Sequence, residues 1–467
     1  MTLSTAVEIS YLFSSVLFVI GLKRLQSPAT ARGGNQLAAL AMLIAIVATL
    51  LDNQVAEWNT ILIGMIVGTF IGAFAAKKVQ MTEMPELVGI FNGFGGAASA
   101  LVAGAELLRL QSLNVISPLG EGLSIVLSCL IGTVTFSGSF VAFGKLKGIV
   151  SGNPITFPLQ KTLNAGLFLG LLVLGGSIMG MFQLGDLTTL NAFYIFTIVA
   201  LSLGILLVIP IGGADMPVVI SLLNSYSGLA ASAAGFVIGS NVLIISGALV
   251  GASGLILTLI MCKAMNRSLA NVAFGAFGGE STVATQGDNS EKIARSVDPE
   301  GAAMILAYAQ SVVVVPGYGL AVAQAQHELR KVIDNLEERG VDVKYAIHPV
   351  AGRMPGHMNV LLAEADVSYD KLFDLDEIND DFDRTDVVLV VGANDVVNPE
   401  AHNPQSVIAG MPILDVDKAK SVIVMKRSLS TGFAGIDNPL FYMNHTSMLF
   451  GDAKESMNDL VREVREA

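Results

Sequence analysis

Charged residues are scarce in this sequence. Asp, Glu, Lys and Arg together account for 14% of the 467 residues, whereas hydrophobic residues account for 52%. Soluble domains usually carry about a quarter charged residues, and the mean hydropathy here is +0.64. This composition excludes a wholly soluble protein and predicts that at least part of the chain lies in a membrane.

Cysteine and histidine are also rare, and their positions exclude several kinds of site. The two cysteines, Cys129 and Cys262, both lie in apolar runs, so neither a disulfide framework nor a metal cluster can be built from them. All five histidines follow residue 300. The apolar part of the chain therefore lacks the side chains that usually bind a metal, haem or iron–sulfur group, and we expect no metal site.

Nine stretches are long and apolar enough to cross a bilayer, for which about 20 residues are needed. The predicted spans are 5–22, 35–51, 58–76, 86–106, 122–144, 163–183, 190–210, 217–237 and 240–262. The first is not a cleavable signal peptide, because its positive charges, Lys23 and Arg24, follow the apolar run instead of preceding it. We expect residues 1–263 to form a membrane domain in contact with the lipid bilayer.

The distribution of charge predicts an orientation. Lysines and arginines follow spans one, three, five and nine, whereas the other loops carry mostly acidic residues. By the positive-inside rule, the N-terminus lies outside and everything after the ninth span lies in the cytoplasm. That last part is acidic, with 25 acidic and 14 basic residues after residue 300, which argues against nucleic acid as a partner.

The predicted membrane domain contains an internal repeat with an offset of 132 residues. Glu83-Met84-Pro85 is followed by Asn92, and Asp215-Met216-Pro217 is followed by Asn224 at the same spacing. Each copy places a carboxylate and a proline at the mouth of a span, with an asparagine about 13 Å deeper along the helix. Such an asparagine either lines an ion path or forms hydrogen bonds between helices, and both interpretations stay open.

The residues after the ninth predicted span fall into two segments of different composition. Residues 264–305 are rich in glycine and polar residues without apolar periodicity, which predicts a linker. Residues 306–467 alternate strand-like and helical segments, which favours a doubly wound, Rossmann-like α/β domain with a parallel sheet. We predict strands at 311–315, 343–348, 386–391, 412–415, 420–425 and 448–450, and helices at 319–338, 358–365, 403–409 and 455–465.

The most informative stretch of this α/β domain is 312–324. Four valines, typical of a buried parallel strand, lead through a proline into Gly317-Tyr318-Gly319 and then into a helical segment. A dinucleotide pyrophosphate needs this order, because glycine lets the backbone approach the phosphates at a helix N-terminus. Val322 stands where the usual fingerprint has a third glycine.

Two features favour NADP(H) over NAD(H). No acidic residue ends the second predicted strand, where an NAD site usually has one for the ribose 2′-hydroxyl. The strand at 420–425 is instead followed by Lys426, Arg427 and Ser428, a set that suits a 2′-phosphate. The other interpretation is that the two cations form an ordinary solvated pair on the surface.

Two further loops follow predicted strands. Gly352-Arg353-Met354-Pro355-Gly356-His357 carries a cation between glycines and either clamps the pyrophosphate or forms a plain turn. Gly392-Ala393-Asn394-Asp395 follows a buried strand, at an edge where ligands bind. Asp395 is either a proton-responsive group near the nicotinamide or a simple cap. The acid-rich segment 374–386 is interpreted as a solvated face.

Over essentially its whole length, the chain resembles the beta subunit of proton-translocating, Re/Si-specific nicotinamide nucleotide transhydrogenase. The motifs that carry the resemblance are Thr82-Glu83-Met84-Pro85-Glu86, Gly213-Ala214-Asp215-Met216-Pro217, Pro316-Gly317-Tyr318-Gly319, Gly352-Arg353-Met354-Pro355-Gly356-His357-Met358-Asn359, Gly392-Ala393-Asn394-Asp395 and Lys426-Arg427-Ser428. The resemblance implies hydride transfer between NADP(H) held here and NAD(H) held by a separate alpha subunit, coupled to proton translocation. It also implies a dimer of alpha–beta units in a bacterial cytoplasmic membrane.

The resemblance also assigns site residues. Those implied for NADP(H) are Gly317, Tyr318, Gly319, Ala321, Val322, Arg353, Met354, Pro355, Gly356, Gly392, Ala393, Asn394, Asp395, Lys426, Arg427, Ser428, Gly432, Phe433 and Ala434. Asp395 would link nucleotide state to protonation. The segment 432–439 resembles the family's lid loop, with Phe433 where many relatives have tyrosine. The residues implied for the proton path or its gate are Asp215, Asn224, Asn92 and Glu83.

One departure from the family concerns Asn92, where many relatives carry histidine. Since the predicted membrane domain has no histidine, either the partner subunit supplies the protonatable group or a carboxylate such as Glu83 or Asp215 carries the proton. Two other functions stay open, an NADP(H)-gated ion transporter without chemistry and a membrane-anchored NADPH reductase. A reductase would need flavin, haem or iron–sulfur ligands, and the apolar part offers no histidine or cysteine set for them.

Overall fold

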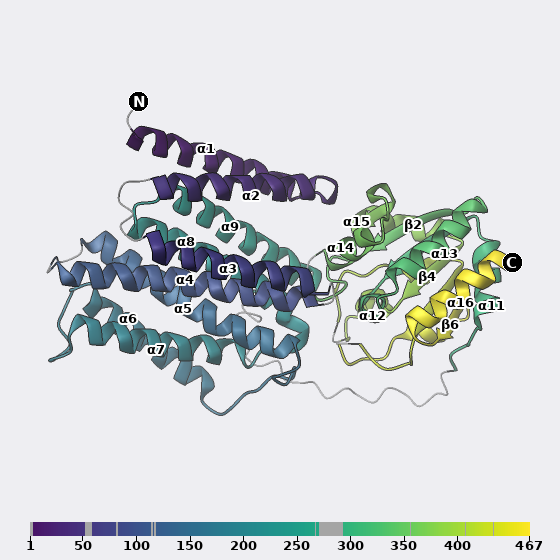
Figure 1. Ribbon diagram of the computed structural model, residues 1–467. Helices are drawn as coiled ribbons and strands as arrows, with labels where there is room; N and C mark the ends of the chain where they lie inside the picture. Colours follow the sequence, from purple (N-terminus) through teal and green to yellow (C-terminus); the bar gives the residue numbers. More distant parts are fainter. Residues whose placement is uncertain are drawn as a thin grey trace. The chain divides into compact units, whose positions relative to one another are not determined.

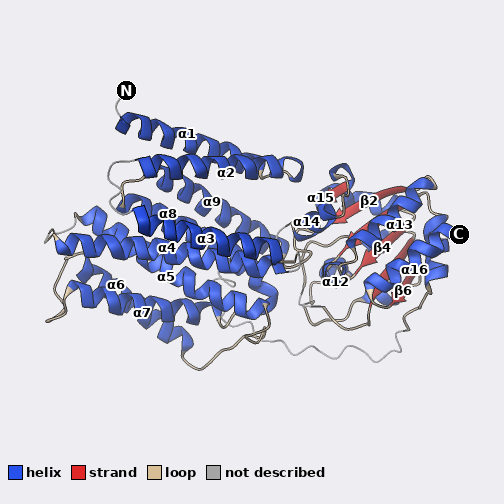
Figure 2. Ribbon diagram, viewed as in Figure 1, coloured by secondary structure: helices blue, strands red, loops and turns tan. Residues whose placement is uncertain are grey.

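The chain divides into two compact units. The computed structural model describes residues 3–51, 58–80, 83–113, 115, 118–266, 268–269, 293–354, 356–406, 408–432 and 434–467. The first unit comprises Met1–Leu259 and Leu269–Gly278, and the second comprises Ile260–Ser268 and Gly279–Ala467. Long helices make up the first unit, whereas the second contains the sheet (Figures 1 and 2).

The first unit is a bundle of apolar helices. Within the described residues, nine helices are long and apolar enough to cross a membrane. They are α1 (Leu3–Arg24), α2 (Pro28–Leu51), α3 (Trp58–Lys78), α4 (Met84–Ser112), α5 (Leu119–Leu146), α6 (Gln160–Ile178), α7 (Thr189–Val208), α8 (Met216–Val237) and α9 (Asn241–Ala264). Each overlaps one of the predicted spans, so that prediction is confirmed. Large apolar side chains point outward, for instance Phe70 at 73% exposure, as expected where the solvent is lipid.

Small residues allow the central helices to pack closely. α4 and α5 meet at Gly96 and Gly132, where a Cβ atom added to Gly96 would lie 2.5 Å from the carbonyl oxygen of Gly132. Ser128 Oγ on α5 lies 3.0 Å from Ser99 O on α4 and 3.2 Å from Ala230 O on α8. Such close contacts and hydrogen bonds hold helices together where water is absent. The two helices that carry the internal repeat, α4 and α8, are therefore both tied to α5.

The second unit is built on a six-stranded sheet in which all neighbouring strands are parallel. The strand order is β3-β2-β1-β4-β5-β6, which is the order of a Rossmann fold. The strands are β1 (Ser311–Pro316), β2 (Asp342–Ile347), β3 (Leu372–Asp374), β4 (Val387–Val391), β5 (Ser421–Lys426) and β6 (Thr446–Phe450). The helices are α11 (Pro299–Ala307), α12 (Tyr318–Ala323), α13 (Gln326–Glu338), α14 (His357–Glu364), α15 (Leu375–Ile378) and α16 (Ala453–Glu466). The predicted fold class is thereby confirmed.

Burial on both faces explains the valine-rich strands. β1 and β4 lie at the centre of the sheet and are buried along almost their whole length. α13 and α16 cover one face (Figure 2). On the other face, alternate strand residues such as Val313 and Val388 pack against Phe382, Leu414 and Phe441, which come from 3-10 turns and loops. The layer on one face of the sheet thus consists of helices. The layer on the other face, called here the irregular layer, consists largely of 3-10 turns and loops.

The irregular layer accounts for two wrong predictions. Residues 412–415 form no strand, because this apolar segment fills the core from a loop in which Leu414 N donates to Val396 O at 2.9 Å. The predicted helix at 403–409 is a series of turns over its described residues. The segment 374–386 is not simply a solvated face either, since Ile378 and Phe382 are fully buried.

Other boundaries also differ from the sequence patterns. The helix expected at 319–338 is two helices, α12 and α13, because Gln324 between them adopts a left-handed conformation with φ of 50°. The patterns do not predict β3, which has only three residues, or α11. Residues 270–292 of the expected linker lie outside the described residues, and its final residues belong to α11.

Candidate functional site

The candidate site lies at the carboxyl edge of the sheet. The strand order reverses between β1 and β4, which are hydrogen-bonded neighbours. Ligands of doubly wound sheets bind at such a switch point, beyond the carboxyl ends of the strands. Lys426 is the last residue of β5, and the segments that begin at this edge carry every other residue predicted for the nucleotide site. They are 317–324 after β1, 348–357 after β2, 392–398 after β4 and 427–438 after β5.

The glycines after β1 and β4 bring two backbones together. Gly319 N donates to Gly392 O at 2.9 Å, and Gly317 N donates to Val391 O at 2.8 Å. A Cβ atom added to Gly317 would lie 2.5 Å from Ala393 Cα. Close packing between the two turns is therefore sufficient to explain glycine at positions 317 and 319. Their predicted approach to a pyrophosphate stays a prediction.

The loop after β2 places a cation against an aromatic ring. The guanidinium carbon of Arg353 lies 4.6 Å from the centroid of the Tyr318 ring, which begins α12. Arg353 N donates to His357 Nδ1 at 3.0 Å, so the loop closes on itself. The His357 ring is only 1% exposed, and burial, helped by the positive charge of Arg353, lowers its pKa. Within the described part of the chain, His357 Nε2 is buried without a hydrogen-bond partner.

Lys426, at the end of β5, is held inside the site instead of extending into solvent. Its Nζ donates to Ser430 O at 2.8 Å and lies 4.6 Å from the centroid of the Phe441 ring. Burial lowers the pKa of Lys426, while Asp395 and Asp437 act in the opposite direction. Arg427 and Ser428 are exposed. The two cations therefore differ, with one partly desolvated and the next one free to reach outward.

Asp395 connects the segment after β4 to the loop after β5, residues 427–438, called here the β5 loop. Ala434 N donates to Asp395 Oδ2 at 3.0 Å. The Asn394 side-chain oxygen, when it faces the same loop, accepts from Lys426 Nζ at 3.0 Å and from Gly432 N at 2.8 Å. A Cβ atom on Gly432 would collide with the Asp395 carboxylate. A side chain at position 432 would therefore require the Asp395 carboxylate to move.

Two buried asparagines, which the sequence interpretation missed, complete this connection. Asn398 Nδ2 donates to Asp437 O, and Asn438 Nδ2 donates to Asn394 O, each at 3.1 Å. Both side chains also cap a 3-10 turn, because their oxygens accept from the backbone N–H two residues further on. The sequence signal is the pair Asn-Pro, which occurs at both places and favours the start of a turn.

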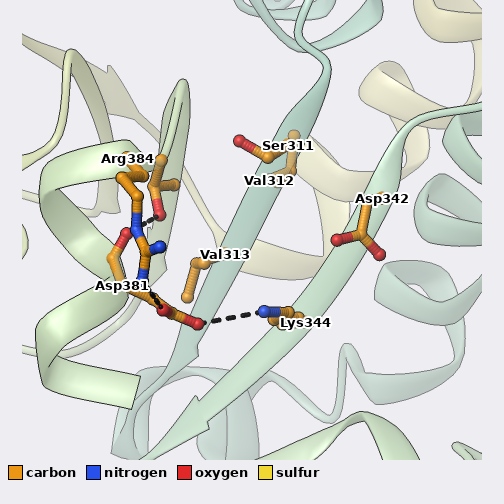
Figure 3. Close-up of a pocket in the computed structure, with 8 residues that line it drawn as sticks. Ser311, Val312, Val313, Asp342, Lys344, Asp381 and Arg384 are labelled. Atoms are coloured by element: carbon orange, nitrogen blue, oxygen red, sulfur yellow. Dashed lines mark hydrogen bonds and ion pairs between the residues drawn. The ribbon is translucent and has the colours of Figure 1, made fainter.

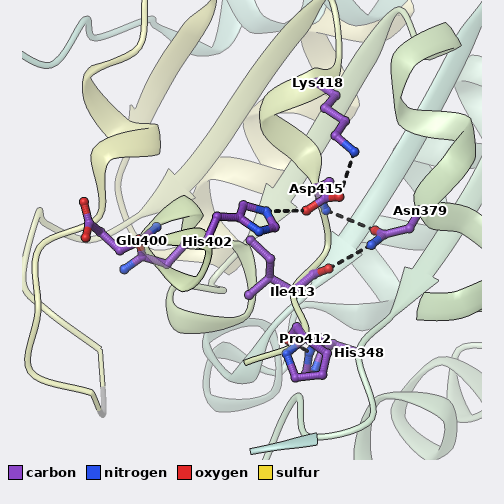
Figure 4. A network of polar contacts seen from close by, with 9 residues as sticks. His348, Asn379, Glu400, His402, Pro412, Ile413, Asp415 and Lys418 are labelled. Carbon is purple, nitrogen blue, oxygen red and sulfur yellow. Dashed lines mark hydrogen bonds and ion pairs between the residues drawn. The ribbon is translucent and has the colours of Figure 1, made fainter. Parts of the chain in front are cut away.

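A second polar network fixes the loop that precedes β5 (Figure 4). Asp415 contacts His402 Nε2 at 3.0 Å and Lys418 Nζ at 2.9 Å, and its backbone N–H donates to Asn379 Oδ1. His348 Nε2 lies 2.8 Å from Pro412 O, and Val350 N donates to His348 Nδ1 at 3.2 Å. Burial lowers the pKa of His348 to about 4. This histidine is therefore neutral and satisfied at both ring nitrogens.

A small pocket of about 210 Å³ lies at the opposite, amino edge of the sheet (Figure 3). The start of β1, the start of β2 and the turn before β4 line it. Its charges compensate one another, because Asp381 pairs with Lys344 at 3.0 Å and with Arg384 at 2.8 Å. It contains none of the predicted nucleotide residues, so it is separate from the candidate site.

The remaining predicted nucleotide residues differ in their surroundings. Ala321 is fully buried, whereas Val322 is 49% exposed. Met354 and Gly356 belong to the Arg353 loop. Pro355 and Phe433 lie outside the described residues.

The two copies of the internal repeat have the same local structure. Glu83 and Asp215 each stand at the N-cap of a helix that begins with Met-Pro, with φ and ψ of −95° and 0° for Glu83 and −89° and −2° for Asp215. Glu83 forms an ion pair with Lys147, which lowers the pKa of the Glu83 carboxyl.

Asn92 lies on α4 where that helix contacts α8, which carries the second copy. It is only 9% exposed, and its Nδ2 lies 3.4 Å from Ile220 O on α8. Ser227 on α8 approaches the Asn92 backbone oxygen in return, at 3.5 Å. Asn224, the equivalent of Asn92 in the second copy, is half-buried. The predicted roles of these asparagines in a proton path stay predictions.

The sequence matches known proteins over nearly its full length. A family model described as NAD(P) transhydrogenase beta subunit matches residues 7–463. The chain is 50% identical over 461 residues to the NAD(P) transhydrogenase subunit beta of Rhodospirillum rubrum, covering 97% of this chain and 98% of that protein. The same protein from a specified strain of R. rubrum gives the same identity and coverage. With the Rossmann strand order and the nine apolar helices, these matches show that the chain belongs to the NAD(P) transhydrogenase beta subunit family.

Proposed function

We propose that this chain binds NADP(H) and couples hydride transfer between NADP(H) and NAD(H) to proton translocation. NAD(H) would be bound by an alpha subunit, since the related R. rubrum protein is named as a beta subunit. The nine apolar helices would lie in a bacterial cytoplasmic membrane, with the second unit in the cytoplasm and two alpha–beta units forming a dimer. The membrane orientation follows from the loop charges.

The observation that carries the proposal is the pair of cations at the end of β5. A 2′-phosphate distinguishes NADP(H) from NAD(H), and Arg and Lys bind phosphate through charge-assisted hydrogen bonds. Lys426 is held within the site by Ser430 and the Phe441 ring, so little side-chain freedom would be lost on binding. Exposed Arg427 stands next to it, and its guanidinium offers a planar set of N–H donors.

Other residues of the edge also fit a dinucleotide. His357 Nε2, buried without a partner among the described residues, lies in the same loop as Arg353 and fits a polar ligand group. Arg353 and Tyr318 form a flat cationic and aromatic surface beside it. NADPH, when bound, supplies the hydride through its nicotinamide ring. The protein's task is then to position the nucleotide and to exclude water.

Asp395 and the β5 loop would regulate access. Ala434 and the Asn398 and Asn438 side chains join this loop to the segment after β4, so that ligand binding and loop position depend on one another. In the first unit, Asn92 and the N-cap carboxylates Glu83 and Asp215 would line or gate the proton path. The Asn92 amide neither gains nor loses a proton near neutral pH, so a carboxylate or a group on the alpha subunit must carry the translocated proton.

Calorimetry on residues 290–467, titrated with NADPH and NADH in parallel, tests the nucleotide assignment. We expect tight binding of NADPH and negligible binding of NADH. Lys426→Ala combined with Arg427→Ala should weaken NADPH binding by about 100-fold or more, because two charged hydrogen bonds are lost. Lys331→Ala, at an exposed lysine of α13, is the matched control. Equal loss of affinity for both nucleotides in the double variant would remove the 2′-phosphate assignment.

A further inference from the structure

Lys145, near the C-terminal end of α5, is a buried cation whose acceptors are all backbone carbonyls. Its side chain is only 5% exposed. Nζ donates to Ile209 O at 2.6 Å, to Ile211 O at 2.7 Å and to Asn153 O at 3.3 Å. A lysine ammonium has three N–H donors, so these carbonyls match all of them. Burying an ammonium group costs free energy unless all its donors are hydrogen-bonded. The three carbonyls around Lys145 Nζ provide those hydrogen bonds.

Two of these carbonyls, those of Ile209 and Ile211, belong to the turn that leads into α8, whereas Asn153 lies in the loop after α5. Ile209 is the C-cap of α7, where the last carbonyls lack partners within the helix and the helix dipole attracts a positive charge. Ile211 lies four residues before Asp215. Gly213 N in the same turn donates to Gly152 O at 2.7 Å. The end of α5 and the loop after it therefore hold the backbone that carries Asp215.

The neighbouring lysine performs the same task for the other copy of the repeat. Lys147, the C-cap of α5, forms its ion pair with Glu83, the N-cap of α4. Glu83 and Asp215 are the equivalent carboxylates of the two copies. Two lysines, separated by one residue at the end of one helix, thus contact both N-cap regions.

We infer that Lys145 and Lys147 are positioning residues, which fix the N-cap carboxylates Asp215 and Glu83 relative to each other from the end of α5. The inference rests on the proposed function, because position matters only if these carboxylates serve proton translocation. Lys145 acts through the backbone of the α7–α8 turn, and Lys147 acts through a direct ion pair. Loss of either contact should lower the number of protons moved per hydride transferred. The affinity for NADPH should stay the same.

The test uses the full chain with its alpha subunit, reconstituted in lipid vesicles. Hydride transfer from NADPH to an NAD⁺ analogue is followed by absorbance, and proton movement is followed with a pH-sensitive dye. Lys145→Met keeps the apolar stem and removes the three donors. We expect the number of protons moved per hydride to fall by about fivefold or more, with NADPH affinity unchanged. Lys77→Met, at an exposed lysine ending α3, is the matched control and should keep the wild-type ratio.

The second variant changes Lys147 and leaves the Glu83 carboxylate in place, because the Glu83–Lys147 pair is partly exposed and a substitution there is compatible with folding. Lys147→Glu should lower the protons moved per hydride, and Lys147→Arg, which keeps the positive charge, should retain the wild-type ratio. A purely structural role would lower both activities together and leave their ratio unchanged. A wild-type ratio in Lys145→Met, or a wild-type ratio in Lys147→Glu when Lys145→Met fails to assemble, would overturn the inference. Wild-type protein that transfers hydride without moving protons would instead refute the proposed coupling itself, and the inference with it.

Discussion

The carboxylate of Asp395 accepts a hydrogen bond from the backbone N–H of Ala434 at 3.0 Å, across 39 residues of sequence. Gly432 lies so close to the same carboxylate that a side chain there would require the carboxylate to move. One charged group thus joins the segment after β4 to the β5 loop, in addition to the hydrogen bonds of Asn398 and Asn438. A change in the charge or position of Asp395 therefore directly alters the contacts that hold the β5 loop.

Asp395→Ala should release this part of the β5 loop. The lost hydrogen bond involves a charged acceptor, and its removal should speed NADPH release from the isolated second unit by about tenfold. Stopped-flow displacement of bound NADPH measures this rate. Asp370→Ala, which removes an exposed carboxylate elsewhere in the unit, is the control. An unchanged release rate in Asp395→Ala would show that the loop is held by its other contacts.

Gly317→Ala should destabilise the second unit more than Gly340→Ala, for a different physical reason. Gly317 has an extended backbone, with φ of −122°, but a Cβ atom there would meet backbone atoms of the turn after β4. Gly340 has φ of +84° and open space around its Cβ position. We expect a loss of about 3 kcal/mol at Gly317 from overpacking and of about 1 kcal/mol at Gly340 from the left-handed backbone. Urea unfolding of both variants measures the difference, and equal losses would contradict the steric explanation.

His348 should make the second unit sensitive to acid. Its folded pKa of about 4 lies below the ordinary value of 6.5, so the unfolded chain binds more protons between these values. The stability contributed by neutral His348 is complete above pH 6.5 and is lost as pH falls towards 4, to a total of about 3 kcal/mol.

Unfolding of the isolated second unit at pH 7 and pH 5 tests this expectation. His348→Gln retains one donor and one acceptor but does not titrate, so much of the difference in unfolding free energy between the two pH values should disappear. His327→Gln, at an exposed histidine of α13, controls for the loss of a histidine. A pH dependence that survives unchanged in His348→Gln would assign the acid sensitivity to other groups.

Asn92→Ala tests which of two roles Asn92 has, lining an ion path or forming hydrogen bonds between helices. The substitution removes the contact of Nδ2 with Ile220 O between α4 and α8. We expect impaired coupled turnover with nearly intact NADPH affinity, because the nucleotide site lies in the other unit. Asn191→Ala, at an exposed asparagine near the start of α7, is the control. Wild-type proton pumping in Asn92→Ala would assign Asn92 to helix packing alone.

The apolar pattern predicted most of the architecture because it is a local property of the chain. A run of about 20 apolar residues needs a membrane whatever surrounds it, and Val312 to Val315 need burial on both sides. The same logic failed at 412–415, where an apolar segment fills a core as a loop and not as a strand. Ile413 and Leu414 are buried there, but apolar character alone does not specify backbone conformation.

By itself, therefore, the sequence determined the nine apolar helices, the α/β unit and the segments that carry the candidate site. The tertiary structure decided which groups contact each other within those segments. Nothing local to Lys145 indicates that its donors reach Ile209 and Ile211, and nothing local to Asn438 indicates its bond to Asn394. Such contacts join residues 44 to 66 positions apart. They exist only once the helices or strands between them are packed, because packing fixes the distance and direction on which a hydrogen bond depends.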